Sequence, residues 1–217
     1  MGMKIAVIQA SSQKDKNTLL YQCVKKSVEN KGWEVVNFGI FPEENVTYSY
    51  IQTALNISML LGSHAVDFVV TGCSSGQGMM LACNSLPSVL CGYIENPSDA
   101  WLFGRINDGN AVSYPLGLNF GWAGEINLQS TLEKLFEEPF GTGYPKKDAI
   151  RKMQDTKRLK EINRISKKTL TEVLPELEKE FIASVLERKI VYDYIMEYGK
   201  NQELKKLMER LHEKIIR

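Results

Sequence analysis

The chain has 217 residues, of which 43% are hydrophobic and 24% charged, the composition of an ordinary soluble globular protein long enough to bury a sizeable core. Its net charge of +1 gives no indication of a polyanionic partner. We find no apolar run of about 18 residues and no signal-like segment at the N-terminus, so we expect a cytoplasmic protein without a membrane partner.

The charge is unevenly distributed along the chain, and the cysteines and histidines are few. Residues 146–217 hold 19 Lys and Arg against 13 Asp and Glu, a balance of +6, so residues 1–145 hold 8 against 13, or −5. The four cysteines form no CxxC pair, and the chain has only two histidines, His64 and His212. We therefore expect neither a disulfide framework nor a metal site.

Strands and helices are predicted to alternate through the first two thirds of the chain. Short apolar runs predict strands at residues 4–9, 33–38, 65–70, 89–94 and 111–114. Helical spacing of apolar residues predicts helices at 19–28, 48–61, 78–85, 98–106 and 123–137. We expect Ser11 or Ser12 to cap the first of these helices and Ser98 the fourth.

This alternation predicts an α/β fold with a doubly wound, five-stranded parallel sheet, a Rossmann-like arrangement of three layers. The strands lack alternating polar residues, which is typical of a sheet covered by helices on both faces. Ligands of such sheets bind at the carboxyl ends of the strands. The turns after the first, third and fourth strands are therefore predicted to form one cleft, where Ser11, Cys73, Ser75 and residues 95–107 fall.

After residue 145 the chain becomes rich in basic residues and its apolar residues follow helical spacing. Residues 146–168 contain ten basic and three acidic residues, and residues 170–198 and 202–216 have the spacing of amphipathic helices. We expect an α/β domain at 1–145 and a helical C-terminal extension at 146–217. This extension is expected to pack on the core or on a second subunit.

The most informative stretch is 69–84, where an apolar strand, a turn of small residues and a helix follow one another. In this arrangement the N–H groups at the start of the helix point toward an anion. The turn also carries the thiol of Cys73, and thiols at the start of a helix can act as bases near neutral pH. A free cysteine is otherwise explained as a small buried apolar residue, the interpretation we favour for Cys23, Cys83 and Cys91.

Residues 72–84 resemble the C-G-T-G-x-G-M…A-x-N loop of the ribose-5-phosphate isomerase B and galactose-6-phosphate isomerase family. Residues 89–112 resemble the next segment of that family, which ends in H-N-D-x-N-V. Residues 3–7 and 31–39 also fit, so the resemblance covers roughly the first 140 residues in the right order. It implies an aldose–ketose isomerase that acts on a pentose, tetrose or hexose phosphate through a cis-enediolate, without metal or organic cofactor.

The resemblance also implies roles for individual residues. Cys73 matches the family's cysteine base, and Ser75 stands where the family has a threonine that bonds a substrate oxygen. The developing oxyanion would meet the N–H groups around Ser74, Gly76, Gln77 and Gly78. Asn107 is implied to contact the substrate, although it also fits a helix end, and Ser11 and Ser12 stand in the binding turn after the first strand. A homodimer is implied, with each cleft completed by the neighbouring subunit.

The chain departs from the family pattern at three places. Ile106 replaces the histidine associated with opening the sugar ring, and Ala10-Ser11 replaces an Asp-His pair. Residues 143–147 do not reproduce the late G-G-R-H pattern whose arginines bind phosphate. The candidate replacements are Lys146, Lys147 and Arg151, which would act as point charges without a two-pronged contact. Our hypothesis is therefore a substrate that cannot cyclise, such as a tetrose phosphate, or one that is already open.

Three alternatives remain at this point. The chain could bind a sugar phosphate without catalysis, retaining the loop alone. The basic residues 146–168 could contact nucleic acid, although no aromatic residues alternate with them and a solvated face or subunit contact explains them better. A cysteine hydrolase is disfavoured because His64 precedes the third strand and so lies at the opposite end of the sheet from Cys73.

Overall fold

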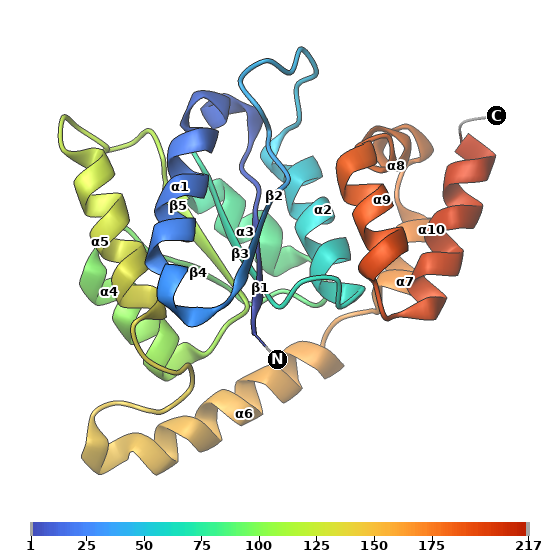
Figure 1. The fold of residues 1–217 in the computed structure, drawn as a ribbon. Coiled ribbons are helices and arrows are strands. Elements are labelled where there is room, and N and C mark those ends of the chain that lie inside the picture. The colour runs from blue at the N-terminus through green and yellow to red at the C-terminus, as the bar shows by residue number, and fades with distance from the viewer. Residues whose placement is uncertain (1, 216–217) are drawn as a thin grey trace.

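A computed structural model describes residues 2–215 (Figure 1). Within these residues, five parallel strands form one sheet in the order β2-β1-β3-β5-β4. The strands are β1 (Lys4–Val7), β2 (Glu34–Asn37), β3 (Phe68–Cys73), β4 (Cys91–Tyr93) and β5 (Ala111–Pro115). The predicted α/β class with a five-stranded parallel sheet is confirmed. Because the strands are parallel, their carboxyl ends lie along one edge, called the carboxyl edge below.

Helices cover both faces of the sheet (Figure 1). One face packs against α1 (Asn17–Ser27), α4 (Pro97–Leu102) and α5 (Gly124–Phe136), and the other against α2 (Tyr50–Gly62) and α3 (Gln77–Ser85). Successive residues of a strand point to opposite faces, so Ile5 and Val7 join the first of these cores while Ala6 and Ile8 join the second. Apolar residues at both sets of positions explain why the strands lack polar alternation.

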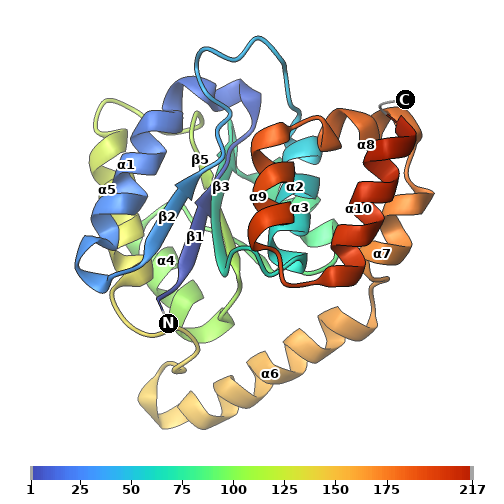
Figure 2. The same ribbon diagram turned by 45° about the vertical axis from the view of Figure 1, so that its right-hand side comes forward.

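The C-terminal region is helical and returns to the sheet (Figure 2). Helix α6 (Ala149–Ile165) passes beside the N-terminal end of the chain, at the amino ends of the strands. It leads to helices that pack beside α2, namely α7 (Leu170–Val173), α8 (Lys179–Leu186), α9 (Lys189–Tyr198) and α10 (Gln202–Ile215). Their apolar residues share one buried cluster with α2 and α3. The expected helical C-terminal region is present, whereas a domain boundary at residue 145 stays a prediction.

Three local predictions are wrong. The single helix predicted at 170–198 is divided, because Pro175 lies in a short 3-10 turn after α7 and Arg188 separates α8 from α9. Ser11 and Ser12 lie inside a 3-10 helix (Ser11–Lys16) and cap no helix. Helix α4 is capped by Asn96 and not by Ser98, since Pro97 fixes the first helical position one residue earlier. Residue 216 of the last predicted helix lies outside the described residues.

Within residues 2–215, no helix is both long enough and apolar enough to cross a membrane.

Strand β3 extends three residues beyond its predicted end at residue 70. It remains paired with β5 up to the Cys73–Pro115 pair, and this pairing includes Gly72. A Cβ atom at Gly72 would overlap the carbonyl oxygen of Tyr114 and lie 2.9 Å from the Leu116 side chain. The absence of a side chain at position 72 therefore lets β3 and β5 stay together, which places Cys73 at the carboxyl edge.

Gly72→Ala should lower the free energy of unfolding by about 2–3 kcal/mol, the usual cost of overpacking against backbone. Urea denaturation followed by circular dichroism measures this change. Gly78→Ala is the matched control, since its Cβ would meet only the Tyr50 ring at 3.6 Å and alanine is the better helix former, so a change within about 1 kcal/mol is expected. Equal urea midpoints for Gly72→Ala and the wild type would contradict this account of β3.

Candidate active site

The carboxyl edge brings the turns after β1, β3 and β5 together. The Ala10 N–H donates to the Gly72 carbonyl at 3.1 Å, and the Leu116 N–H donates to the Cys73 carbonyl at 3.0 Å. Cys73, the last residue of β3, therefore lies between the turn after β1 and the turn after β5. The sequence-predicted association of the first and third turns is present in the structure.

The Cys73 side chain points into the layer between the sheet and helices α2 and α3. It belongs to the buried cluster that contains Ala10 and Met79, and 8% of its surface is exposed. Cys73 thus lies in the outer part of the buried core, at the carboxyl edge of the sheet. The other three cysteines are also free and buried, as expected of apolar packing residues.

The turn after Cys73 is held in a conformation that starts a helix. Gly76 has φ 72° and immediately precedes α3, and a Cβ there would lie 2.9 Å from both the Pro115 nitrogen and the Tyr93 ring. The buried Ser113 hydroxyl donates to the Gly76 carbonyl at 2.7 Å. The first turn of a helix leaves N–H groups without intrahelical acceptors, so the backbone at Gln77 and Gly78 can bind a negatively charged oxygen.

Polar side chains link the turns at this edge. The Gln13 amide donates to the Ser74 hydroxyl at 2.9 Å, and that hydroxyl lies 3.4 Å from the Ser12 hydroxyl. The Ser74 carbonyl accepts the N–H groups of Gly117 and Leu118 at 3.0 and 2.7 Å. Ser12 and Ser74 are exposed, whereas Ser75 is half-buried, so the predicted residues form one polar rim beside the thiol.

The remaining predicted residues either have an engaged side chain or lie at the other edge of the sheet. The Ser11 hydroxyl accepts the N–H of Tyr48 at 2.7 Å and so is already engaged by the loop that precedes α2. Asn107 ends the helical segment before β5, which places it at the amino edge of the sheet, opposite Cys73 in the same chain. The proposed replacements for the phosphate-binding arginines, Lys146, Lys147 and Arg151, lie near the same amino edge, in or just before α6.

Sequence reasoning missed several residues at the carboxyl edge. Gln13, Lys14 and Lys16 lie in the 3-10 helix Ser11–Lys16 of the turn after β1, so their polar character in the turn after a strand was a usable signal. Glu44 lies in the loop between β2 and α2, which we call the 38–49 loop. Its partner Arg188 is 144 positions away, and no periodicity or spacing connects the two residues.

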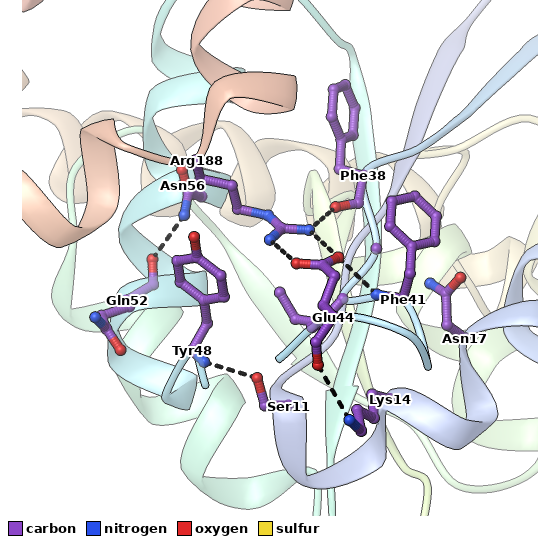
Figure 3. Close-up of polar contacts among 12 residues, drawn as sticks. Ser11, Lys14, Asn17, Phe38, Phe41, Glu44, Tyr48, Gln52, Asn56 and Arg188 are labelled. Carbon is purple, nitrogen blue, oxygen red and sulfur yellow. Dashed lines mark hydrogen bonds and ion pairs between the residues drawn. The ribbon is translucent and has the colours of Figure 1, made fainter. Parts of the chain in front are cut away.

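Arg188 and Glu44 form an ion pair between the C-terminal helices and the 38–49 loop (Figure 3). The Arg188 guanidinium donates to both carboxylate oxygens of Glu44, at 2.7 and 3.0 Å, and also to the Phe38 carbonyl. The Arg188 side chain is 3% exposed and that of Glu44 23%. Burial alone would raise the pKa of Glu44, but the hydrogen bonds from Arg188 and the Phe41 N–H, with the charges of Arg188 and Lys14, lower it.

The sequence profile of the Ribose/Galactose Isomerase family matches residues 8–153. The chain belongs to the ribose/galactose isomerase family. The match spans about two thirds of the chain and contains β2 to β5 with the Cys73 turn. Membership of this family makes the chain a sugar isomerase, in preference to a cysteine hydrolase or a binding protein without catalysis.

Solved structures extend the likeness over the C-terminal helices. A crystal structure of a 4-deoxy-L-threo-5-hexosulose-uronate ketol-isomerase with a tartrate is 39% identical, with TM-score 0.93, and covers 97% of this chain and 100% of its own. A ribose-5-phosphate isomerase from Vibrio parahaemolyticus is 34% identical, with TM-score 0.91 and the same coverage. No curated protein sequence matches the chain.

Solved structures of lower identity match a smaller share of the chain. A type B ribose 5-phosphate isomerase from Trypanosoma brucei is 19% identical with TM-score 0.60 and covers 77% of this chain but 100% of its own. This likeness supports the fold alone.

Because the pKa of Glu44 is lowered, the effect of Glu44→Gln on the free energy of unfolding should depend on pH. A lowered pKa stabilises the fold above the ordinary value of 4.5, and this contribution is lost as the pH falls through the lowered value. At pH 7 the variant should therefore be less stable than the wild type by about 2 kcal/mol, and the difference should shrink below pH 4.5. Urea denaturation at several pH values measures this.

Glu34→Gln provides the matched control, because Glu34 pairs with Lys4 on the surface with its side chain 53% exposed. Its effect should stay below about 0.5 kcal/mol at every pH. A stability difference between Glu44→Gln and the wild type that grows as the pH falls would contradict the prediction.

Proposed function

We propose that the chain is a ketol-isomerase of an open-chain uronic acid, which interconverts a C1 aldehyde and a C2 ketone. The observation that carries the proposal is the 39% identity, over 97% of this chain, to the 4-deoxy-L-threo-5-hexosulose-uronate ketol-isomerase. The ribose-5-phosphate isomerase covers the same share at 34% identity, so the choice between the two substrates depends on individual residues.

The first residue that supports a uronate is Ile106. The family histidine at this position is associated with ring opening, which ribose phosphates require because their C4 hydroxyl closes a ring on C1. A 4-deoxy-5-hexosulose uronate has no oxygen on C4 and a carbonyl at C5, so neither usual ring can close on its aldehyde. An isoleucine at position 106 is therefore compatible with this substrate.

The cations at the carboxyl edge also fit a carboxylate better than a phosphate. A uronate carries one negative charge at its end, whereas a phosphate monoester carries about 1.5 to 2 and is commonly bound by arginine forks. Here Lys14 and Lys16 lie in the turn after β1, with the Lys16 ammonium 3.9 Å from the Phe120 ring centroid. We assign these two lysines as candidate contacts for the substrate carboxylate.

The proposed reaction moves two protons and no net electrons. The Cys73 thiolate takes the proton from C2, and the electron pair left behind forms the enediolate with C1. The proton on O2 passes to O1, and the Cys73 thiol returns its proton to C1, which gives the 2-ketose. Backbone N–H groups from Ser74 to Gly78 stabilise the enediolate oxygen, while the Ser75 hydroxyl bonds the substrate oxygens.

Other ionisable groups near the turn are already engaged, which supports Cys73 as the base. The Tyr93 hydroxyl donates to the Glu95 carboxylate at 2.6 Å, and burial together with this carboxylate raises the pKa of Tyr93. The Asp99 carboxylate accepts the Asn96 amide at 2.8 Å within the cap of α4.

The site is proposed to require a second copy of the chain. Asn107 lies at the amino edge of its own sheet, so it reaches a substrate at a Cys73 turn only from a neighbouring subunit. The exposed Asn107 side chain and its place next to α6 are compatible with such a homodimer. Each active site would then combine Cys73 of one copy with Asn107 of the other.

Turnover of candidate substrates tests the proposed function. The wild type should convert the hexosulose uronate with a kcat/KM at least about 100-fold above that for ribose 5-phosphate, because the missing ring-opening group penalises only the cyclic sugar. In deuterium oxide the ketose should gain deuterium at C1. Cys73→Ser should lower kcat by about 1,000-fold or more, since a serine hydroxyl is not ionised near neutral pH.

Cys23→Ser is the control. Cys23 lies on the buried side of α1, on the opposite face of the sheet from Cys73, so the kcat of this variant should stay within about twofold of the wild type. Preference for ribose 5-phosphate would reject the uronate proposal. Absence of deuterium exchange with every sugar tested would indicate a binding protein, and full activity of Cys73→Ser would reject the thiol as base.

Mixing two inactive variants tests the shared site. Cys73→Ala and Asn107→Ala homodimers should each lose most activity, but subunit exchange should restore about a quarter of the wild-type rate, because half of the dimers then hold one intact site out of two. Steady-state rates before and after mixing measure the recovery. Mixing Cys73→Ala with itself is the control, and no recovery in the mixed sample would contradict a shared site.

A further inference from the structure

The Arg188 side chain extends to the 38–49 loop from helices α8 and α9, which pack on the core through apolar residues. Helices α8 and α9 already bury Val185, Leu186 and Val191 in the core beside α2. Arg188 lies between them, and its guanidinium crosses to Glu44 and the Phe38 carbonyl. A buried ion pair gives little net stability compared with apolar contacts. The packing of α8 and α9 therefore does not explain why an arginine is buried at position 188.

The loop is shaped around this guanidinium. Gly39 has φ 80°, and a Cβ there would lie 2.7 Å from the Arg188 nitrogen and 2.9 Å from the Glu44 carboxylate. The Arg188 guanidinium also lies over the Tyr48 ring, 4.7 Å from its centroid. Arg188 therefore contacts the start, middle and end of the 38–49 loop.

The same loop holds residues of the proposed binding turn. The Tyr48 N–H donates to the Ser11 hydroxyl at 2.7 Å, and the Ser11 N–H donates to the Tyr48 carbonyl at 3.1 Å. The Glu44 carbonyl accepts the Lys14 ammonium at 3.1 Å. Figure 3 shows these contacts leading from Arg188 through Glu44 and Tyr48 to Lys14 and Ser11.

We propose that Arg188 is a positioning residue for substrate binding, which fixes Ser11 and Lys14 through the 38–49 loop without touching the substrate. The inference rests on the proposed function for the role of Lys14, and it gives the C-terminal helices a part in an active site formed by the sheet. Loops at the carboxyl edge are otherwise the mobile part of such folds. Arg188 converts this one into a fixed wall of the site.

Steady-state kinetics and hydrogen exchange of the full chain test the proposal. Arg188→Met should raise KM about tenfold and change kcat less than about threefold, because the lost contacts affect binding and not the thiol. The amides of Ser11 and Tyr48 should exchange faster in the same variant. Arg188→Lys, which keeps the charge but not the two-pronged contact, should give an intermediate KM.

Combining Arg188→Met with Glu44→Gln tests the route through Glu44. The double variant should have nearly the KM of Arg188→Met alone, since both changes break one linkage. Lys189→Met is the matched control, because Lys189 pairs with Asp193 on the surface of α9, and its KM should equal that of the wild type. Hydrogen exchange needs no substrate, so it reports on the loop even if the uronate is not turned over.

Several outcomes would overturn the proposal. Unchanged KM and exchange in Arg188→Met would show that Arg188 only stabilises the fold. Additive KM effects in the double variant would reject the route through Glu44. If Arg188→Met does not fold, Arg188→Lys and Glu44→Gln decide, and wild-type KM in both rejects the role. A wild type active only on ribose 5-phosphate rejects the uronate alone, and the variants are then compared on that sugar.

Discussion

The site depends on the pairing of β3 with its neighbours as far as Cys73. A thiol reaches the edge of a sheet only if its strand is held to the last residue, and Gly72 permits this because it leaves room for the Tyr114 backbone. The same pairing aligns the turns after β1 and β5 with the Cys73 turn. Ser113 then fixes Gly76, so the start of α3 is set by the neighbouring strand and not by a cap of its own.

Features with local signals could be predicted from the sequence, and features made by distant contacts could not. Apolar runs predicted the strands and their parallel arrangement, because strands that are buried on both faces are apolar along their whole length. The order of the strands in the sheet was not predicted. The end of β3 was placed too early, since Thr71 and Gly72 join the strand only through β5. Pro175 and Pro97 explain the misplaced helix limits, whereas Arg188 is recognised beside Glu44 only in three dimensions.

The departures from the family pattern agree with one another. The proposed linear, singly charged substrate accounts for three of them together, namely Ile106 in place of the ring-opening histidine, the missing late G-G-R-H pattern and the two lysines after β1. A change of substrate on a constant fold requires the reaction centre to stay while the groups around it vary. Here the Cys73 turn is retained and the residues that would contact the rest of the sugar differ.

The sequence distance between Glu44 and Arg188 has a consequence for biosynthesis. Glu44 leaves the ribosome 144 residues before its ionic partner, a delay of roughly 7–30 s at usual elongation rates. During this interval the sheet can assemble, but the carboxylate has no guanidinium to meet. Prematurely terminated chains therefore lack the guanidinium that contacts the 38–49 loop, so only molecules whose translation has nearly finished can form this ion pair.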